Sequence, residues 1–363
     1  MPSKMTASKK TDSLRQSGSP GDIDLRSDTV TLPNEGMRQA MMSAELGDDV
    51  IDIDPTVQRL QHVIAERVGQ EAAIFMPSGT MTNQVALRVH CRPGDEFLCE
   101  ERCHIFNFEQ GAFAQLSGLV ARTIPTESSL LELSDVQSRI RPLSEHMTRT
   151  RLLCLENTHN LGGGRIHSLE SIQELCRWAN SKGLASHLDG ARLFNAVVAT
   201  GIEADQWGSP FDTVSVCFSK GLGAPVGSAL CGPRDLIDQA RFHRKLFGGA
   251  MRQSGILAAA ALYALEHQVE RLAEDHEVAQ ILSDGIQNCE RLTLDPATVE
   301  TNIVIFQVDP DWGTAQQFVE AVAAKGVRVM PFSATHVRAV THLHVNATMA
   351  HKAVEIMTEV AAS

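Results

Sequence analysis

The stretch "DTVSVCFSKGLGAPVG" at residues 212–227 combines an apolar strand pattern, a lysine and a glycine-rich turn. Val214, Val216 and Phe218 alternate with smaller residues in the way that predicts a β-strand. Lys220 follows where that strand ends. A charged amine among apolar residues and glycines costs free energy unless a partner uses it. The stretch therefore predicts a buried strand that delivers Lys220 to a site of chemistry.

Short apolar runs and amphipathic stretches alternate on both sides of this strand. Further strands are predicted at 71–76, 95–100, 118–124, 150–159, 184–192 and 226–232. Helices are predicted at 81–90 and at 168–183, where apolar residues recur at helical spacing up to a glycine. This alternation indicates the α/β class, with a mostly parallel sheet covered by helices on both faces.

The pattern changes after residue 255. One long helical stretch is predicted at 256–287, followed by short strands and two helices that describe a small α+β unit. We therefore expect a large domain at 23–255, and a linking helix with a small C-terminal domain at 256–363. Residues 1–22 are polar and rich in serine and lysine, and we expect them to form a disordered tail.

Composition excludes several classes of partner. The formal net charge of -12 argues against nucleic acid or an anionic membrane. No run of about 18 apolar residues predicts a membrane span. The first residues lack the apolar core of a secretory signal, although a transit peptide is an alternative. The eight cysteines follow no disulfide-like spacing, which favours a reduced, cytoplasmic setting.

Polar side chains follow most of the predicted strands. In open α/β sheets, functional groups gather just beyond the carboxyl ends of the strands. The residues at these positions are Ser78, Gly79, Thr80, His104, Glu156, Asn157, His159, Asp189, Arg192, Ser219 and Lys220. We expect them to form one charged, hydrogen-bonding site over an apolar floor.

These groups suit pyridoxal 5'-phosphate. The amine of Lys220 can form a Schiff base with an aldehyde, and Asp189 can keep a pyridine nitrogen protonated. The turn at Ser78 and Thr80 opens a helix, so its hydroxyls and backbone N–H groups can bind a phosphate. His104 has a flat face that can lie on the ring.

Simpler interpretations exist for each signal taken alone. An aspartate and a lysine 31 positions apart are more often structural, and "SGT" before a helix is usually an N-cap. "GLGAPVG" resembles a dinucleotide fingerprint, but Pro225 interrupts it and a strand follows. Cys99, Cys103 and His104 form the one close Cys/His cluster, yet no second ligand pair at zinc spacing follows.

The order of the motifs decides between these interpretations. The chain resembles the L-threonine aldolase family, in the β-eliminating lyase group of fold-type I pyridoxal-phosphate enzymes. The matching motifs are "DLRSDTVTLP", "GDDV", "DPTVQRLQ", "EAAIFMPSGTMTNQVAL", "LENTHN", "HLDGARLFNA", "SKGLGAPVGSAL" and "GGAMRQSGILAAA". The resemblance runs from about residue 23 to the C-terminus. It implies an aspartate-aminotransferase-like fold: a large domain with a mostly parallel seven-stranded sheet, and a small C-terminal α+β domain.

The resemblance also assigns roles. It implies that Lys220, His159 and His104 are catalytic, with His159 near the substrate β-hydroxyl and His104 stacked on the cofactor. The implied cofactor-binding residues are Ser78, Gly79, Thr80, His104, Asp189, Arg192, Lys220, Lys245 and Arg252. The implied ligands of the substrate carboxylate are Ser27, Arg192 and Arg338. No cluster of metal ligands is predicted.

The resemblance implies a lyase that cleaves L-threonine or L-allo-threonine to glycine and an aldehyde. Racemisation or β-elimination on the same scaffold is the alternative, and a non-catalytic or NAD-binding α/β protein is a more distant one. A homo-oligomer, dimer or tetramer, is implied, with Lys245 and Arg252 reaching a neighbouring subunit's site. Two stretches depart from the family: Ile51 stands where a tyrosine is frequent, and residues 105–111 match less closely.

Overall fold

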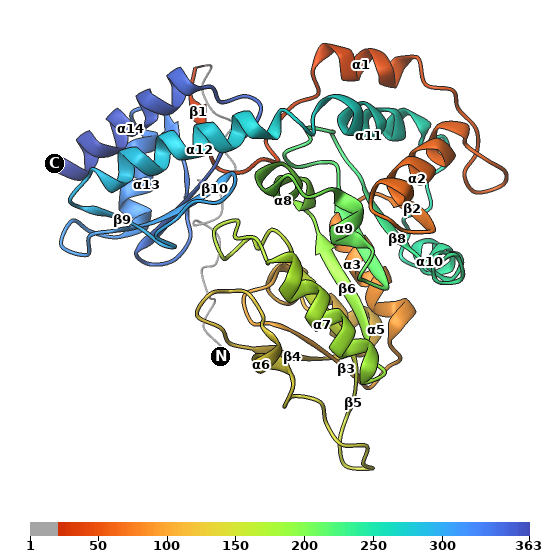
Figure 1. The fold of residues 1–363 in the computed structure, drawn as a ribbon. Coiled ribbons are helices and arrows are strands. Elements are labelled where there is room, and N and C mark those ends of the chain that lie inside the picture. The colour runs from red at the N-terminus through yellow and green to blue at the C-terminus, as the bar shows by residue number, and fades with distance from the viewer. Residues whose placement is uncertain (1–20) are drawn as a thin grey trace, which may run out of the picture.

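The computed structural model describes residues 21–363. Residues 1–20 of the predicted tail lie outside the described part. Two units are visible in Figure 1: a large one built around an extended sheet, and a smaller one at the left of the view. The helix that begins at Leu272 connects them, as Figure 1 shows.

The large unit contains a seven-stranded sheet with the order β2-β8-β7-β6-β5-β3-β4. Only β8 runs antiparallel to its neighbours, so the prediction of a mostly parallel sheet is confirmed. The strands are β2 (Ala72–Met76), β3 (Asp95–Glu100), β4 (Val120–Ile124), β5 (Arg149–Glu156), β6 (Ala185–Gly190), β7 (Thr213–Cys217) and β8 (Ser228–Gly232).

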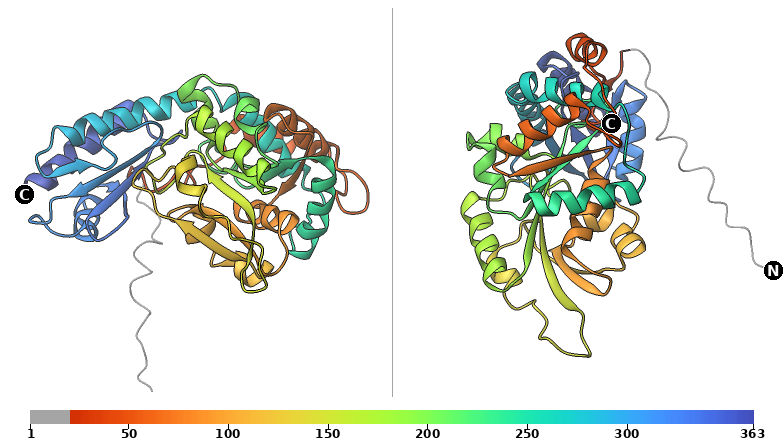
Figure 2. Two further views of the ribbon diagram at one scale, coloured as in Figure 1. Left: turned by 60° about the horizontal axis from the view of Figure 1, so that its bottom comes forward. Right: turned by 90° about the vertical axis from the view of Figure 1, so that its right-hand side faces the viewer.

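Helices cover both faces of this sheet, as the two views of Figure 2 show. The helices of the large unit are α1 (Glu35–Met42), α2 (Pro55–Arg67), α3 (Gly79–His90), α4 (His104–Asn107), α5 (Ala112–Ser117), α6 (Leu133–Val136), α7 (Leu169–Ser181), α8 (Leu193–Thr200), α9 (Ala204–Gly208), α10 (Arg234–Leu246) and α11 (Gly255–His267). Strand β2 illustrates the layering, because its alternate residues serve two different cores. Phe75 packs into the core shared with α2, whereas Ile74 packs into the core shared with α3 and α10.

The small unit has its own core and a four-stranded antiparallel sheet with the order β12-β13-β10-β9. Its elements are α12 (Leu272–Gln287), β9 (Leu292–Leu294), β10 (Ile303–Val308), α13 (Ala315–Ala323), β11 (Val327–Arg328), β12 (Met330–Pro331), β13 (His336–Val340) and α14 (Ala347–Ala362). Among the described residues, no helix is long and apolar enough to cross a membrane.

Two features of the chain path differ from the sequence-based expectation. The single helix expected at 256–287 is two helices, α11 and α12, because the first half packs on α1 and α2 and the second half packs on α14. The start of the described chain belongs to the small unit: β1 (Ile23–Asp24) pairs with β11, and Leu25 is buried in the small unit's core. The domain division at residue 255 stays a prediction.

One buried carboxylate ties three segments of the large unit together. Asp54 is fully buried and caps α2, where its Oδ1 accepts hydrogen bonds from the N–H groups of Thr56 and Val57, both at 3.1 Å. Its Oδ2 accepts from Gly47 N–H at 3.2 Å and from Gly255 N–H, at the start of α11, at 2.9 Å. A side chain at position 255 would clash with this carboxylate. Asp54 therefore fixes the ends of α2 and α11 to each other.

We expect Asp54→Ala to lower the free energy of unfolding by about 3 kcal/mol, because four N–H groups, two of them buried, lose their acceptor. Urea denaturation followed by circular dichroism measures this change. Asp52→Ala is the control, since Asp52 is exposed and its side chain makes no hydrogen bond in the described part of the chain. Equal stability of the two variants would contradict the role given to Asp54.

Candidate active site

The carboxyl ends of the central strands bring the predicted polar residues together. The register of the sheet pairs Glu156 of β5 with Asp189 of β6, and Asp189 with Ser215 of β7. Lys220 lies three residues beyond the end of β7. Its amine makes no hydrogen bond or ion pair with any described residue, yet its charge is close enough to lower the pKa of Asp28 and of Asp189.

Asp189 is a buried carboxylate that stays charged. Burial on its own raises its pKa, but the nearby positive charges of His104 and Lys220 outweigh this effect and lower the pKa. The Asn83 amide donates a hydrogen bond to Asp189 Oδ2 at 2.7 Å, and the Ala191 N–H donates to Oδ1 at 3.1 Å. An ionised carboxylate at this position can hold the proton of a ring nitrogen.

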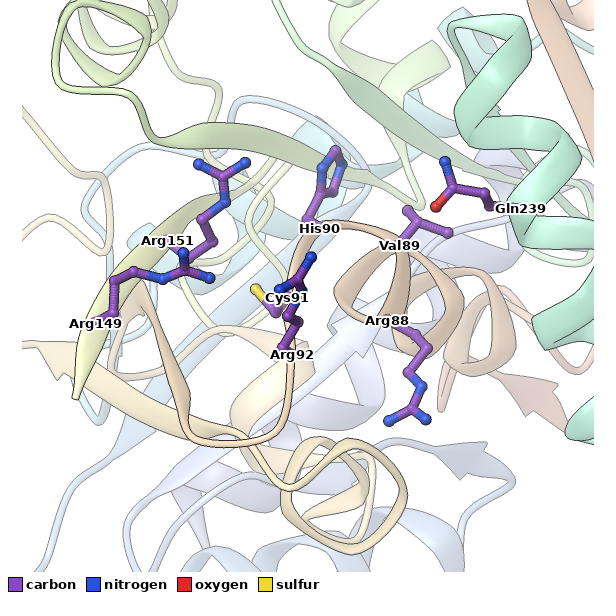
Figure 3. Close-up of a pocket in the computed structure, with 8 residues that line it drawn as sticks. All are labelled: Arg88, Val89, His90, Cys91, Arg92, Arg149, Arg151 and Gln239. Carbon is purple, nitrogen blue, oxygen red and sulfur yellow. The ribbon is translucent and has the colours of Figure 1, made fainter.

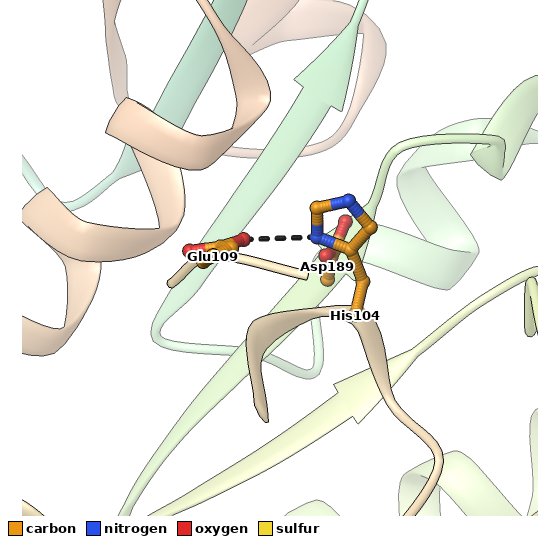
Figure 4. A group of neighbouring side chains, drawn as sticks. All are labelled: His104, Glu109 and Asp189. Carbon is orange, nitrogen blue, oxygen red and sulfur yellow. Dashed lines mark hydrogen bonds and ion pairs between the residues drawn. The ribbon is translucent and has the colours of Figure 1, made fainter. Parts of the chain in front are cut away.

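His104 lies beside Asp189 and is positioned by two glutamates. Its Nδ1 is 3.0 Å from Glu109 Oε1, as Figure 4 shows, and its backbone N–H donates to Glu156 Oε2 at 2.6 Å. Burial on its own lowers the pKa of the His104 ring. The hydrogen bond to Glu109 and the carboxylates of Asp189 and Glu156 reverse the direction and raise the pKa. These carboxylates therefore favour the charged form of the ring next to Asp189.

Glu109 is a site residue that the sequence analysis missed. It is 3 % exposed and accepts hydrogen bonds from the side-chain amides of Asn83 at 2.8 Å and Gln84 at 2.6 Å, in addition to His104. The segment 105–111 matched the family only loosely, yet it supplies this carboxylate, which bonds to three side chains. The one local signal for Glu109 was its position, five residues after the candidate ring of His104.

The same three side chains are the one group of the described residues whose spacing could accept a metal ion. The ligand atoms of His104, Glu109 and Asp189 lie within 4.8 Å of one another. The Asn83 amide donates hydrogen bonds to Glu109 and to Asp189, and His104 Nδ1 bonds to Glu109. These side chains therefore have hydrogen-bond partners within the protein. The cysteines of the considered zinc cluster are buried in an apolar core with Phe97, so they do not join His104 in this group.

A chain of hydrogen bonds continues from Asp189 through the large unit. Asn83 Oδ1 is 3.1 Å from His187 Nε2, and His187 Nδ1 is 2.9 Å from Thr213 Oγ1. The same hydroxyl lies 2.9 Å from His90 Nε2, at the far end of α3. Burial lowers the pKa of His187 and of His90 to about 4, so both rings are neutral at physiological pH. Asn83 is thereby fixed with its amide NH₂ toward Asp189.

The turn at the start of α3 faces a buried hydroxyl. Ser78 caps the helix, since its Oγ accepts a hydrogen bond from the Met81 N–H at 3.2 Å, so the simpler interpretation of this motif as an N-cap holds. Ser78 and Thr80 are exposed. The buried Ser228 Oγ has no hydrogen-bond partner and lies 3.6 Å from the position that a side chain on Gly79 would occupy. These free donors and the helix N-terminus can together hold a phosphate.

The two predicted arginines meet at one amide, although they come from different units. Arg338 Nη1 donates to Asn160 Oδ1 at 3.0 Å, and Arg192 Nη1 lies 3.4 Å from the same oxygen. Burial, with the neighbouring charge of Arg192, lowers the pKa of Arg338 to about 10, so it remains charged at neutral pH. Asn160 is the last residue of the family motif "LENTHN", and no role was predicted for it from the sequence.

Asp28 holds Arg192 in place. Arg192 Nε and Nη2 donate to the two Asp28 carboxylate oxygens, both at 2.8 Å, and both residues are buried. Burial on its own raises the pKa of Asp28, but the charges of Arg192 and Lys220 lower it to about 2. Its neighbour Ser27, the predicted substrate ligand, hydrogen-bonds to Thr29 instead, at 2.8 Å. Because Nε and Nη2 of Arg192 are bound to Asp28, Nη1 is the nitrogen that remains to donate to another group.

His159 is 1 % exposed and lies beside another glutamate. The Gly162 N–H donates to its Nδ1 at 3.0 Å, so a neutral ring carries its proton on Nε2. Nε2 is 3.2 Å from Glu100 Oε2, which is ion-pair distance, but it is not aligned for a hydrogen bond. Glu100 thus faces the Nε2 atom of His159 at ion-pair distance, a contact that was not predicted from the sequence.

Lys245 and Arg252 lie outside this set in the same chain. Both are exposed, and neither makes a hydrogen bond or ion pair with Asp189, Ser78 or Thr80 in the described structure. Arg252 Nη1 instead binds Asp48 Oδ2 at 3.0 Å.

Comparison with known proteins agrees with this geometry. The family model of the beta-eliminating lyases matches residues 24–309. The chain is 43 % identical over 326 residues to the probable low-specificity L-threonine aldolase 2 of Arabidopsis thaliana, covering 88 % of this chain and 92 % of the relative. It is also 43 % identical over 325 residues to the low specificity L-threonine aldolase of Escherichia coli K12, covering 89 % and 95 %.

Solved structures share the fold. A putative L-allo-threonine aldolase from Listeria monocytogenes superposes with a TM-score of 0.78 at 21 % identity, covering 94 % of this chain and 97 % of that one. The threonine aldolase of Leishmania major gives a TM-score of 0.78 at 20 % identity, covering 93 % and 99 %. From the family match, the relatives and the site geometry together, this chain belongs to the beta-eliminating lyase family, in the group of the low-specificity L-threonine aldolases.

Proposed function

We propose that this protein is a pyridoxal-phosphate-dependent lyase that cleaves L-threonine and L-allo-threonine to glycine and an aldehyde. One observation carries the proposal. Lys220 presents an amine without a bonding partner, close enough to the buried, ionised Asp189 to lower its pKa. A small ring with an aldehyde on one side and a basic nitrogen on the other can engage both groups.

The residues present fit this cofactor. Asp189 would hold the pyridine nitrogen, His104 would lie on the ring, and Ser78, Gly79 and Thr80 would hold the phosphate. The unpaired buried hydroxyl of Ser228 beside Gly79 supports the last assignment, because a buried hydroxyl without a partner is costly unless a ligand satisfies it. When bound, pyridoxal phosphate supplies a sink for the electron pair released when the substrate's Cα–Cβ bond breaks.

Arg192 and Arg338 would bind the substrate carboxylate, joined by Ser27. Asn160 holds one donor of each arginine toward a common point, and Asp28 locks the plane of the Arg192 guanidinium. Two fixed guanidinium groups prevent the substrate from rotating about its Cα–N bond. The protein thereby selects which bond at Cα is aligned for cleavage.

His159 with Glu100 would take the proton of the substrate's β-hydroxyl, directly or through a water. The charged form of the His159 ring is stabilised by the Glu100 carboxylate 3.2 Å away. Acceptance of a proton at Nδ1 requires the hydroxyl or a water to displace the Gly162 N–H. Lys220 would hold the aldehyde carbon of the cofactor and His104 would lie against its ring, while the cofactor would supply the electron sink.

We expect Lys220→Ala to abolish threonine cleavage, because no other described amine lies near Asp189. The release of glycine measures cleavage, and the visible absorbance of the purified protein with added cofactor measures whether the cofactor is bonded to residue 220. Formation of glycine with an aldehyde, rather than of the D-amino acid or of pyruvate with ammonia, separates cleavage from the alternative chemistries. Normal turnover in Lys220→Ala would refute the proposed function.

We expect His159→Asn to lower kcat by about 10²–10⁴-fold, the usual contribution of a general base, while cofactor affinity changes little. Glu100→Gln should lower kcat by a smaller factor, because it removes the charge that stabilises the protonated ring. Steady-state kinetics and cofactor titration of both variants test this. If cofactor affinity and kcat fall together in His159→Asn, the residue has a structural role only.

We further propose a homo-oligomer that forms through one apolar surface of the large unit. This apolar surface consists of the exposed side chains Leu46, Ile51, Ile53, Phe242 and Leu246, which are 44–78 % exposed. Ion pairs of Asp48 and Asp49 with Arg252 and Arg244 hold the segment around Ile51 against the end of α10. Large exposed apolar patches mark interfaces in soluble proteins. Pairing of two copies here would bring Lys245 and Arg252 toward a neighbour's site.

We expect the double variant Ile51→Asp/Phe242→Asp to reduce the molar mass in solution from that of a dimer or tetramer, because four charges would be buried in each symmetric interface. Size-exclusion chromatography with light scattering measures the mass. Leu143→Asp is the control, since Leu143 is 94 % exposed and lies outside this surface. An unchanged mass in the double variant would place the interface elsewhere.

A reduced, cytoplasmic setting is part of the same proposal. The eight cysteines are all unpaired, and seven of them are buried. Burial raises the pKa of the Cys231 thiol beyond its ordinary range and that of Cys176 to about 12, so these thiols stay protonated and unreactive.

A further inference from the structure

A second polar cavity lies at the other end of the large unit's sheet. It has a volume of about 400 Å³ and is lined by Arg88, Val89, His90, Cys91, Arg92, Arg149, Arg151 and Gln239. Helix α3 begins at the proposed phosphate turn and ends in this cavity, whereas β5 begins here and ends at Glu156. The cavity is therefore separated from the candidate active site by the length of these elements.

Four arginines line this cavity, and one of them, Arg149, is paired with a carboxylate. Arg149 forms a bidentate pair with Asp95, with Nε to Oδ1 at 3.0 Å and Nη2 to Oδ2 at 2.8 Å. Arg151 Nη1 donates to the Gly183 carbonyl at 2.8 Å, and its remaining donors are free of carboxylates. The side chains of Arg88 and Arg92 make no hydrogen bond or ion pair with any described residue.

Figure 3 shows how these side chains lie. The guanidinium groups of Arg92, Arg149 and Arg151 gather on the side of the cavity where His90 stands, and the Arg88 side chain points away from them. Like charges on one wall repel one another, and Asp95 offsets this repulsion in part, since the charges of Arg149 and Arg151 both lower its pKa. The chain as a whole carries a net charge of -12, so this concentration of positive charge is a local feature.

The donors present match phosphate. A guanidinium offers two parallel N–H groups in a plane, which suits phosphate oxygens, and several such groups favour a ligand with more than one negative charge. His90 and Gln239 add neutral polar groups to the wall. A neighbouring cavity of about 330 Å³ shares Val89, His90 and Arg151 and is lined further by Asn180, Gly183, Leu184, Ala185, Asp212 and Leu236. The Asp212 carboxylate accepts hydrogen bonds from Ser186, so the anion itself belongs in the first cavity, away from Asp212.

We propose that this arginine-lined cavity binds a compact polyanion of the phosphate class, at a site separate from the candidate active site. The site uses Arg92 and Arg151 as its free cations, with Arg149 held in place by Asp95 and Arg88 at the edge. None of these arginines has a role in the proposed cleavage reaction. A test of the anion site therefore does not depend on whether the proposed reaction is correct.

Isothermal titration calorimetry of the cofactor-loaded protein with inorganic pyrophosphate tests the proposal, at constant ionic strength. The cofactor fills the proposed phosphate turn, which keeps pyrophosphate from binding there. We expect saturable binding that weakens at least about tenfold in Arg92→Gln/Arg151→Gln, because two charged donors are lost. The single variant Arg92→Gln should show a smaller loss and preserves the fold, since this side chain bonds to no described residue.

The control Arg291→Gln/Lys352→Gln removes the same charge from exposed positions of the small unit and should bind as the wild type does. Absence of saturable binding to the wild-type protein would overturn the proposal. Equal affinity of Arg92→Gln/Arg151→Gln and the wild type would place the anion elsewhere and overturn it too. Tighter binding of citrate than of pyrophosphate would refute the assignment to the phosphate class.

Discussion

The ionised carboxylate of Asp189 at the buried end of β6 is the constraint on which the rest of the site depends. Burial alone would protonate it, and a protonated acid could not hold the proton of a ring nitrogen. Its pKa is kept low by the charges of His104 and Lys220 and by the Asn83 amide. The strand register places this carboxylate between Glu156 and Ser215, so the sheet itself decides where the ring of a cofactor can lie.

Helix α3 connects the parts of this arrangement. Its first turn offers the proposed phosphate site, and Asn83 one turn later supplies the amide that Asp189 and Glu109 share. The orientation of that amide is fixed in turn by His187, Thr213 and His90, which form a neutral hydrogen-bonded chain through the sheet. A helix that is rigid over its whole length can hold these groups at fixed separations, as preorganised electrostatics require.

The proposed substrate side of the site depends on contact between the two units. Arg192 starts α8 in the large unit, Arg338 lies on β13 in the small unit, and Asn160 joins them. Asp28 comes from the beginning of the described chain, shortly after β1 pairs with β11 of the small unit. The N-terminal segment, which carries one of the family motifs, therefore links the small unit, through β1, to Arg192 of the large unit, through Asp28.

Local patterns in the sequence determined the strands of the large sheet, the helices α3 and α7, and the residues at the strand ends. Alternation and helical spacing are short-range signals, and they predicted the mostly parallel sheet, with Lys220 beyond β7 and Asp189 at the end of β6. The resemblance to the family extended this to Arg338, which the structure places on β13.

Only the tertiary structure decided how those residues are held. Asp28 pairs with Arg192 across 164 residues, and Asn83 reaches Asp189 across 106. Glu109 lies in a segment without periodicity, so nothing local marked it as a partner of His104. Such pairings arise from sheet order and helix packing, which set distances between segments far apart in the chain. A periodic pattern carries information about the nearest turn or pleat, and therefore about which face a residue takes, but not about which distant carboxylate it will meet.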